Sequence, residues 1–142
     1  MANELVEISI VSPVYMAEDL VEDLLSRISE TMDKMDVTYE IILIEDGGPD
    51  NSWDVIKKAH EHYPKLRAFQ LSRNFGQHYA ITAGMSKVRG KWAIIIDCDL
   101  QDRPEEIPTL YRKAQEGFDV VVAKREGRKD GFWKKMSSKW FY

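Results

Sequence analysis

Two carboxylates spaced two residues apart, Asp97 and Asp99, are the strongest candidates for chemistry in this sequence, and Gln101 and Asp102 follow directly. Mg²⁺ and Mn²⁺ prefer oxygen ligands and often take only one or two carboxylates from a protein, which leaves positions for a substrate phosphate. Aspartate is also common at turns and helix caps, so this spacing fits a turn as well as a metal site. The position after an apolar strand, Trp92–Ile96, favours the metal site.

Two further charged positions could bind a ligand. Asp46 follows Glu45 at the end of an apolar run and precedes Gly47-Gly48. Its carboxylate could accept a hydrogen bond from a base or ribose, and the glycines would let the backbone approach a flat ligand. An ordinary tight turn before a capped helix explains the same residues, and the local pattern favours that turn. Arg73 could neutralise a diphosphate, although a lone loop arginine is usually a solvated surface charge.

Short apolar runs and apolar residues at helical spacing predict the elements that would position these residues. The expected strands are Ile8–Val11, Glu40–Ile44, Leu66–Leu71, Trp92–Ile96 and Asp119–Ala123. The expected helices are an apolar stripe from Leu20 to Met35, a short helix over Trp53–Ala59 capped by Asp50 or Asn51, Gln77–Val88, and a helix from Pro104 to Gly117. This order predicts an α/β fold with a mostly parallel sheet and helices on both faces. Ligands bind such sheets beyond the carboxyl ends of the strands, where the polar loops fall.

Charge and composition narrow the classes of partner and compartment. The net charge of −4 over 142 residues argues against a general nucleic-acid-binding surface. Residues 123–142 contain seven Lys or Arg against two acids, a balance of +5 that leaves −9 on the rest of the chain and suggests an anionic partner for this end. Cys98 is the only cysteine, which excludes an intrachain disulfide, and the sequence has neither a secretory signal pattern nor a run of ~20 apolar residues. We therefore expect a soluble, cytoplasmic chain.

Four blocks of sequence, taken in order, resemble the motifs of family 2 glycosyltransferases. They are Val11–Glu18 (VSPVYMAE), Ile44–Ser52 (IEDGGPDNS), Ser72–Gln77 (SRNFGQ) and Asp97–Glu105 (DCDLQDRPE). They are most similar to the dolichol- or polyprenyl-phosphate sugar transferase branch. The resemblance implies a GT-A fold, a Rossmann-like sheet that binds a nucleotide diphospho-sugar and a divalent cation, Mg²⁺ or Mn²⁺.

The resemblance also implies roles for individual residues. Pro13, Tyr15 and Glu18 would line the nucleotide pocket, Asp46 would contact the base, and Arg73 would complete the nucleotide-sugar site. Asp97, Asp99 and Gln101 would hold the metal and the diphosphate, with Asp97 and Asp99 as the catalytic pair, and Arg125 would lie near an acceptor phosphate. The chain departs from the family at Glu45-Asp46-Gly47-Gly48, where Asp-Asp-Gly-Ser is commoner, so the preferred base is open.

The expected activity is metal-dependent, inverting transfer of a hexosyl group to an acceptor, with polyprenyl phosphate favoured, in cell-envelope or glycolipid synthesis. We expect residues 1–124 to form the donor-binding domain. Residues 125–142 would begin a basic, aromatic, membrane-proximal acceptor side, truncated here, of a protein associated with the cytoplasmic face of a membrane. In that segment apolar residues at helical spacing with lysines between them predict an interfacial helix, or equally a helix packed on its own protein.

Three alternatives remain open at this stage. The chain could bind a nucleotide sugar without catalysing transfer. It could belong to a transferase that acts on a saccharide hydroxyl, which would need a general base from outside the chain. It could be a phosphohydrolase that forms a phosphoaspartate on Asp97, although such enzymes usually have threonine where Gln101 stands.

Overall fold

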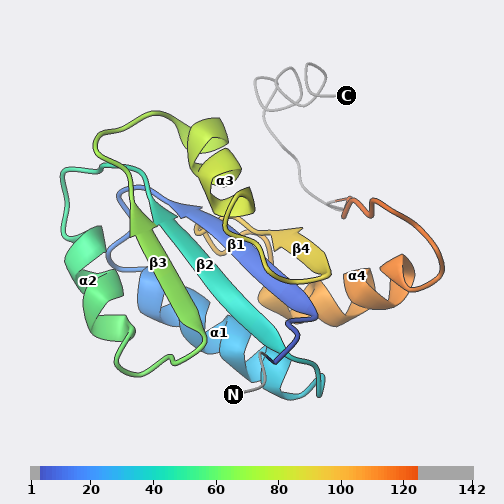
Figure 1. Cartoon of the computed structure of the whole chain (residues 1–142). Coiled ribbons are helices and arrows are strands. Elements are labelled where there is room, and N and C mark those ends of the chain that lie inside the picture. Colours follow the sequence, from blue (N-terminus) through green and yellow to red (C-terminus); the bar gives the residue numbers. More distant parts are fainter. Residues whose placement is uncertain (1–3, 125–142) are drawn as a thin grey trace. The chain divides into compact units, whose positions relative to one another are not determined.

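The computed structural model describes residues 4–124 (Figure 1). The chain divides into two compact units, Met1–Thr109 and Leu110–Tyr142. The first unit contains the whole sheet and the four loops of interest. No helix within residues 4–124 is both long enough and apolar enough to span a bilayer.

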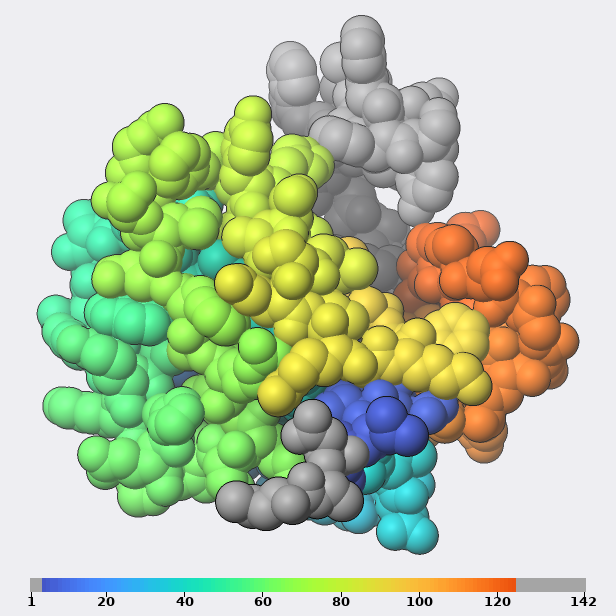
Figure 2. All heavy atoms as spheres, in the orientation of Figure 1, coloured from blue at the N-terminus to red at the C-terminus, as the bar shows by residue number. Residues whose placement is uncertain are grey.

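The sheet has four parallel strands in the order β3-β2-β1-β4. Their bounds are β1 Ile8–Val14, β2 Tyr39–Glu45, β3 Leu66–Gln70 and β4 Trp92–Ile95. Every residue of β1 and β2 is buried, which agrees with their continuous apolar runs. In Figure 2 very little of the blue β1 is visible, because later segments cover it. β1 is longer than expected and continues through Pro13, which pairs with Ile44.

Helices cover both faces of the sheet, as the sequence predicted. α1 (Val21–Asp33) lies behind the sheet and α3 (Gln77–Met85) in front of it (Figure 1). α2 (Ser52–Ala59) connects β2 to β3. Gly84 allows α3 to pack closely, since a Cβ there would lie 2.5 Å from Val11 Cγ1. The mostly parallel α/β sheet is therefore confirmed.

Two expectations about the end of the chain need correction. A 3₁₀ turn over Pro104–Glu106 leads into α4 (Ile107–Ala114), so the helix ends before Gly117. Asp119–Ala123 is not a strand: Val120 is 78% exposed and Val122 is 64% exposed. A β-branched run becomes a strand only where a neighbour completes its hydrogen bonds, and in residues 4–124 the sheet consists of β1 to β4.

Candidate active site

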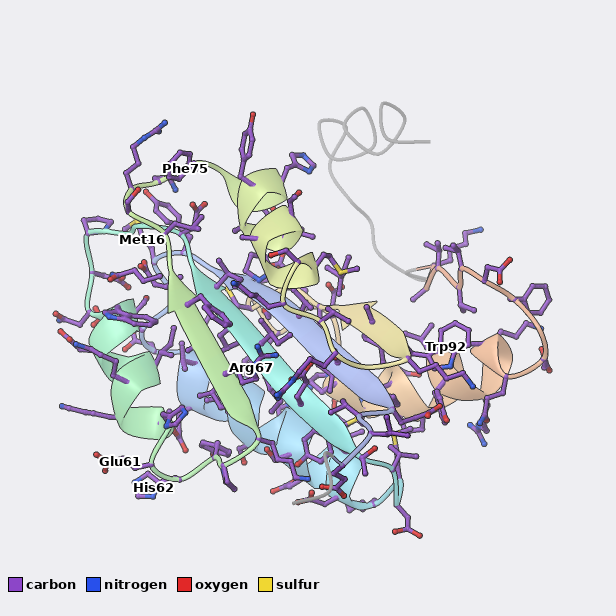
Figure 3. The ribbon with its side chains drawn as sticks, viewed as in Figure 1. Met16, Glu61, His62, Arg67, Phe75 and Trp92 are labelled. Carbon is purple, nitrogen blue, oxygen red and sulfur yellow. The ribbon has the colours of Figure 1, made fainter. Side chains whose placement is uncertain are left out.

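The loops that follow β1, β2, β3 and β4 contain nearly all the predicted site residues. Because the strands are parallel, these loops leave the sheet at the same edge, which we call the carboxyl edge. Figure 3 shows Met16 and Phe75 at this edge, from the first and third loops. Sequence blocks that are far apart along the chain are therefore brought together.

Hydrogen bonds tie the first loop to the second. The Ala17 N–H donates to Ser52 Oγ (3.0 Å), and the Glu18 N–H donates to Asp50 Oδ2 (3.3 Å). Ser52 Oγ in turn donates to Asp50 Oδ2 (2.8 Å). Asp50 caps the start of α2 as expected, because its Oδ1 accepts the N–H of Ser52 (3.2 Å), and it also joins the two loops, which fixes the backbone next to Tyr15 and Glu18.

The turn after β2 packs tightly around Glu45. This buried carboxylate accepts the N–H of Gly47 (3.2 Å), the N–H of Gly48 (2.7 Å) and the side-chain amide of Gln70 (3.1 Å). Gly47 has φ +65°, and a Cβ there would lie 2.2 Å from the carbonyl carbon of Arg73. The second and third loops therefore touch backbone to backbone, and only glycine fits at the contact.

Asp46 anchors the third loop. It is 2% exposed, and its carboxylate accepts the N–H of Phe75 (2.9 Å), the N–H of Gly76 (3.1 Å) and the side-chain amide of Asn74 (3.2 Å). A buried carboxylate needs such donors, and here the next loop supplies all three. The contact with a base stays a prediction, and the anchoring role is the one that these bonds show.

Arg73 and Phe75 form an exposed pair on this third loop. The Arg73 guanidinium lies 3.9 Å from the centre of the Phe75 ring, and its Nη1 donates to the carbonyl of Asn74 (3.1 Å). Phe75 is 38% exposed, and the ring of Tyr79 lies 6.4 Å from it. A cation stacked on an aromatic ring is held in place without burial, so Arg73 is available to an anion at this edge.

The fourth loop folds around the two carboxylates noted first. Asp97 is partly buried, and its Oδ1 accepts the N–H of Cys98 (2.8 Å). The Asp97 N–H donates to Asp102 Oδ2 (3.2 Å), and the exposed Asp99 accepts the N–H of Gln101 (2.9 Å). The turn and the acidic cluster are therefore the same structure, so the two explanations of the spacing do not exclude each other.

Negative charge concentrates at Asp97. Burial raises the pKa of its carboxyl group, and the neighbouring charges of Asp99 and Asp102 raise it further. Burial likewise raises the pKa of the Cys98 thiol, which keeps that side chain neutral. An added cation would relieve the repulsion among the carboxylates. This is the electrostatic setting expected of a cation site.

The donor set fits a hard divalent cation only in part. Among residues 4–124, no three or more His, Cys, Asp or Glu side chains gather as a metal cage. Asp97 and Asp99 with the amide oxygen of Gln101 would supply an incomplete oxygen set, as in sites where substrate phosphate completes the coordination of Mg²⁺. The fit is therefore to a metal that binds together with its substrate.

The structure places the remaining predicted residues as follows. Tyr15 is exposed and Glu18 half-buried in the first loop, whereas Pro13 is buried within β1. Arg125 lies outside the described residues, as does the basic segment that begins there. Asn74 and Gln77 were not predicted as site residues, although both belong to the block SRNFGQ. The polar side chains of that block could have indicated both residues, but only Arg73 was predicted as a site residue.

A sequence model described as "Glycosyl transferase family 2" matches residues 9–142. That match includes all four loops of the carboxyl edge. The chain belongs to glycosyl transferase family 2. The four ordered motifs indicated this family, and the assignment is confirmed.

Relatives of this family 2 chain are named for transfer to a lipid phosphate. An undecaprenyl-phosphate 4-deoxy-4-formamido-L-arabinose transferase from Aeromonas hydrophila is 43% identical over 133 residues, covering 93% of this chain and 41% of the relative. The chain thus spans less than half the length of the curated relatives it matches. The resemblance to the polyprenyl-phosphate branch is confirmed.

Solved structures share the fold at low sequence identity. The glucosyl-3-phosphoglycerate synthase from Mycobacterium tuberculosis, in complex with phosphoglyceric acid, superposes with a TM-score of 0.70 at 20% identity over 92% of this chain and 47% of that one. A mannosyltransferase from Pyrobaculum calidifontis, in complex with GDP-Man and Mn²⁺, has a TM-score of 0.60 at 19% identity over 68% of this chain and 28% of that one. These similarities confirm the GT-A fold.

Proposed function

We propose that this chain is the donor-binding part of an enzyme that transfers a sugar from a nucleotide diphospho-sugar to a polyprenyl phosphate, with Mg²⁺ or Mn²⁺ bound at Asp97 and Asp99. The main support is the fourth loop. A partly buried carboxylate lies there among like charges, at the edge where the other three loops converge. A divalent cation would offset that charge and would allow an anionic diphosphate to bind beside it.

Each loop has a distinct part in this proposal. The loop with Tyr15 and Glu18, following Pro13, borders the nucleotide, and Arg73 pairs with the diphosphate. Asp97 and Asp99 hold the cation with help from Gln101, and when bound the cation stabilises the charge that develops on the departing diphosphate.

The base contact predicted for Asp46 stays part of the proposal. A carboxylate oxygen has two lone pairs, so Asp46 could accept one more hydrogen bond beside those it accepts from the third loop.

The acceptor is proposed from chemistry and from the relative's name. A polyprenyl phosphate offers an oxygen that is already anionic, so a strong general base is not needed and attack can proceed with inversion. Arg125 would meet the acceptor phosphate. The name of the Aeromonas hydrophila protein contains an L-arabinose derivative, which supports a modified pentose here and not the hexose that the sequence analysis expected.

The cellular setting is proposed on the same basis. Residues 1–124 would bind the donor, and the basic residues 125–142 would begin an acceptor side at the cytoplasmic face of a membrane. Seven Lys or Arg in residues 123–142 support attraction to an anionic lipid surface.

Calorimetry and a transfer assay on one sample test the proposal. We expect UDP- and GDP-sugars to bind better with Mn²⁺ than without it, and the donor that binds best to label undecaprenyl phosphate. Binding without transfer would support the alternative of a donor-binding module. Transfer to a saccharide hydroxyl would contradict the lipid acceptor, and an absence of metal-dependent binding would contradict the proposal as a whole.

A further inference from the structure

Gln77 connects the third loop to the cation site. It is the first residue of α3, and its exposed side-chain amide donates to Asp97 Oδ2 at 3.4 Å. The other carboxylate oxygen, Oδ1, accepts the N–H of Cys98. Donors therefore hold both oxygens of Asp97, one from its own loop and one from α3. Together they favour one orientation of the carboxylate, although the contact from Gln77 is long for a hydrogen bond.

The start of α3 is itself held by Asp46. The residue before the helix, Gly76, has φ +105° and no side chain that could cap the helix. The Asp46 carboxylate accepts the N–H groups of Phe75 and Gly76, immediately before Gln77. Its negative charge also suits the N-terminal end of a helix. The position of Gln77 is thus set by Asp46, which follows β2, whereas Asp97 follows a different strand, β4.

A second contact limits movement of the same segment. Gly47 packs against the Arg73–Asn74 peptide so closely that a Cβ would lie within 2.4 Å of the Asn74 nitrogen. The Asn74 side-chain amide also donates to the carbonyl oxygen of Asp46 (3.1 Å). The segment 73–76 is therefore held by hydrogen bonds on one side and by direct packing on another.

We propose that Gln77 is a positioning residue that orients Asp97 for the divalent cation, and that Asp46 sets Gln77 through the backbone of residues 74–76. This inference rests on the proposed function. Asp97 lies among like charges, which would drive its side chain towards solvent. A neutral donor on Oδ2 opposes that movement without competing for the cation. Supporting residues of this kind typically change metal affinity by about 10- to 100-fold.

The first test is Gln77→Ala, with Mn²⁺, alone and in the presence of UDP, as the probe and its electron paramagnetic resonance signal as the readout. We expect Mn²⁺ affinity to fall about 10-fold and the thermal unfolding midpoint to stay unchanged, because Gln77 is exposed. The control is Met85→Ala, a truncation at the other end of α3, which should leave the affinity unchanged. A merely structural role would move the midpoint and the affinity together, and that result would overturn the inference.

The second test breaks the link at Asp46. In Asp46→Asn, hydrogen exchange at the Phe75 and Gly76 amides should speed up, and Mn²⁺ affinity should fall at least as far as in Gln77→Ala. If Asp46→Asn fails to fold, Asn74→Ala loosens the same segment from the exposed side. Faster exchange with unchanged Mn²⁺ affinity, in either variant, would overturn the link.

Mn²⁺ binding distinguishes a failure of the Gln77 positioning role from a failure of the proposed metal-dependent function. If the unaltered chain binds Mn²⁺ and Gln77→Ala binds it equally well, Gln77 has no positioning role and the proposed function stands. If the unaltered chain binds no Mn²⁺, alone or with UDP, the metal-dependent function and the inference built on it both fail.

Discussion

Glu40 at the amino edge of the sheet and Asp97 at the carboxyl edge are carboxylates in opposite surroundings. At the amino edge, Glu40 is 2% exposed and accepts hydrogen bonds from Ser9 Oγ (2.7 Å), Arg67 Nη1 (2.9 Å) and Arg89 Nε (2.9 Å). Figure 3 shows Arg67 on the front face of the sheet, away from the loops of the carboxyl edge. At the carboxyl edge, Asp97 meets other carboxylates instead of arginines.

The pKa values follow this difference. Burial alone would raise the pKa of Glu40, but hydrogen bonds from Ser9, Arg89 and Arg67 outweigh it and lower the pKa to about 2. For Asp97 burial raises the pKa and its neighbours add to the effect. Glu40 therefore contributes to stability, whereas the charge of Asp97 is not balanced by the fold. A site for a cation requires the second arrangement.

The largest effect should come from neutralising the carboxyl edge. The double substitution Asp97→Asn and Asp99→Asn should weaken Mn²⁺-dependent nucleotide-sugar binding by more than about 100-fold, above the loss typical of a supporting residue. It should leave the unfolding midpoint unchanged or higher, because repulsion is removed. Calorimetry and thermal unfolding measure the two quantities. The control is Asp36→Asn, which removes a single carboxylate charge from an exposed loop before β2 and should leave both the binding and the midpoint unchanged. A lower midpoint in the double variant would contradict the comparison.

The amino edge should respond in the opposite sense. Glu40→Gln should lower the free energy of unfolding by about 2 kcal/mol, less than its pKa shift alone would imply because the partner arginines are partly exposed and regain water. Urea unfolding measures this. Mn²⁺ affinity should be unchanged, and a loss of affinity would show that the two edges are not independent.

Low pH should remove the stabilisation that the ionised Glu40 carboxylate contributes to the fold. The Glu40 carboxyl group has a folded pKa of about 2 against an ordinary value of 4.5. Its stabilisation is therefore fully present above pH 4.5 and is lost as the pH falls towards about 2. The difference in unfolding free energy between the unaltered chain and Glu40→Gln should shrink over that window. A difference that stays constant down to pH 2 would contradict the pairing with arginine.

Gly47→Ala tests the packing of the second loop on the third. The substitution forces a side chain into a left-handed conformation and against the Arg73 backbone. We expect a cost of about 1–3 kcal/mol in unfolding free energy and weaker Mn²⁺ binding, because the loop shifts. Gly117→Ala is a control, with a positive φ but open space around the Cβ, and should cost less. Equal costs would show that strain alone matters.

The smallest effect should come from the surface ion pair of Arg27 with Glu105, in which the pKa of the carboxyl group is lowered as far as that of Glu40. The hydrogen bond from Arg27 lowers the pKa of Glu105 to about 2, the same value as for Glu40. The Glu105 side chain is 43% exposed, so solvent screens the pair, and Glu105→Gln should cost less than about 1 kcal/mol. Urea unfolding of Glu105→Gln and Glu40→Gln under the same conditions would compare their losses of unfolding free energy. Equal losses would show that the burial of the carboxylate does not determine how much each pair stabilises the fold.

The sequence was sufficient for the elements of the sheet and for the family, because both depend on local patterns. Continuous apolar runs located β1 to β4, and four loop motifs located the carboxyl edge. Asp119–Ala123 was wrong because a strand needs a neighbour, which no local pattern supplies. The roles of Glu40 and Asp46 could not be predicted, since their partners lie 27 to 49 residues away. A buried acid looks the same in sequence whether arginines, amides or other acids surround it.

The strand order also determines when the site can form. β1 pairs with β2 early in the chain, but its other edge must wait for β4, where Trp92 pairs with Ile8 across most of the described sequence. Closing so long a loop costs more entropy than any other pairing in this sheet. Asp97 follows β4 directly, so the acidic loop takes its place only after that closure. During synthesis from the N-terminus, the pairing of β1 with β2 can therefore form first, and the carboxyl edge is completed only after β4 has joined the sheet.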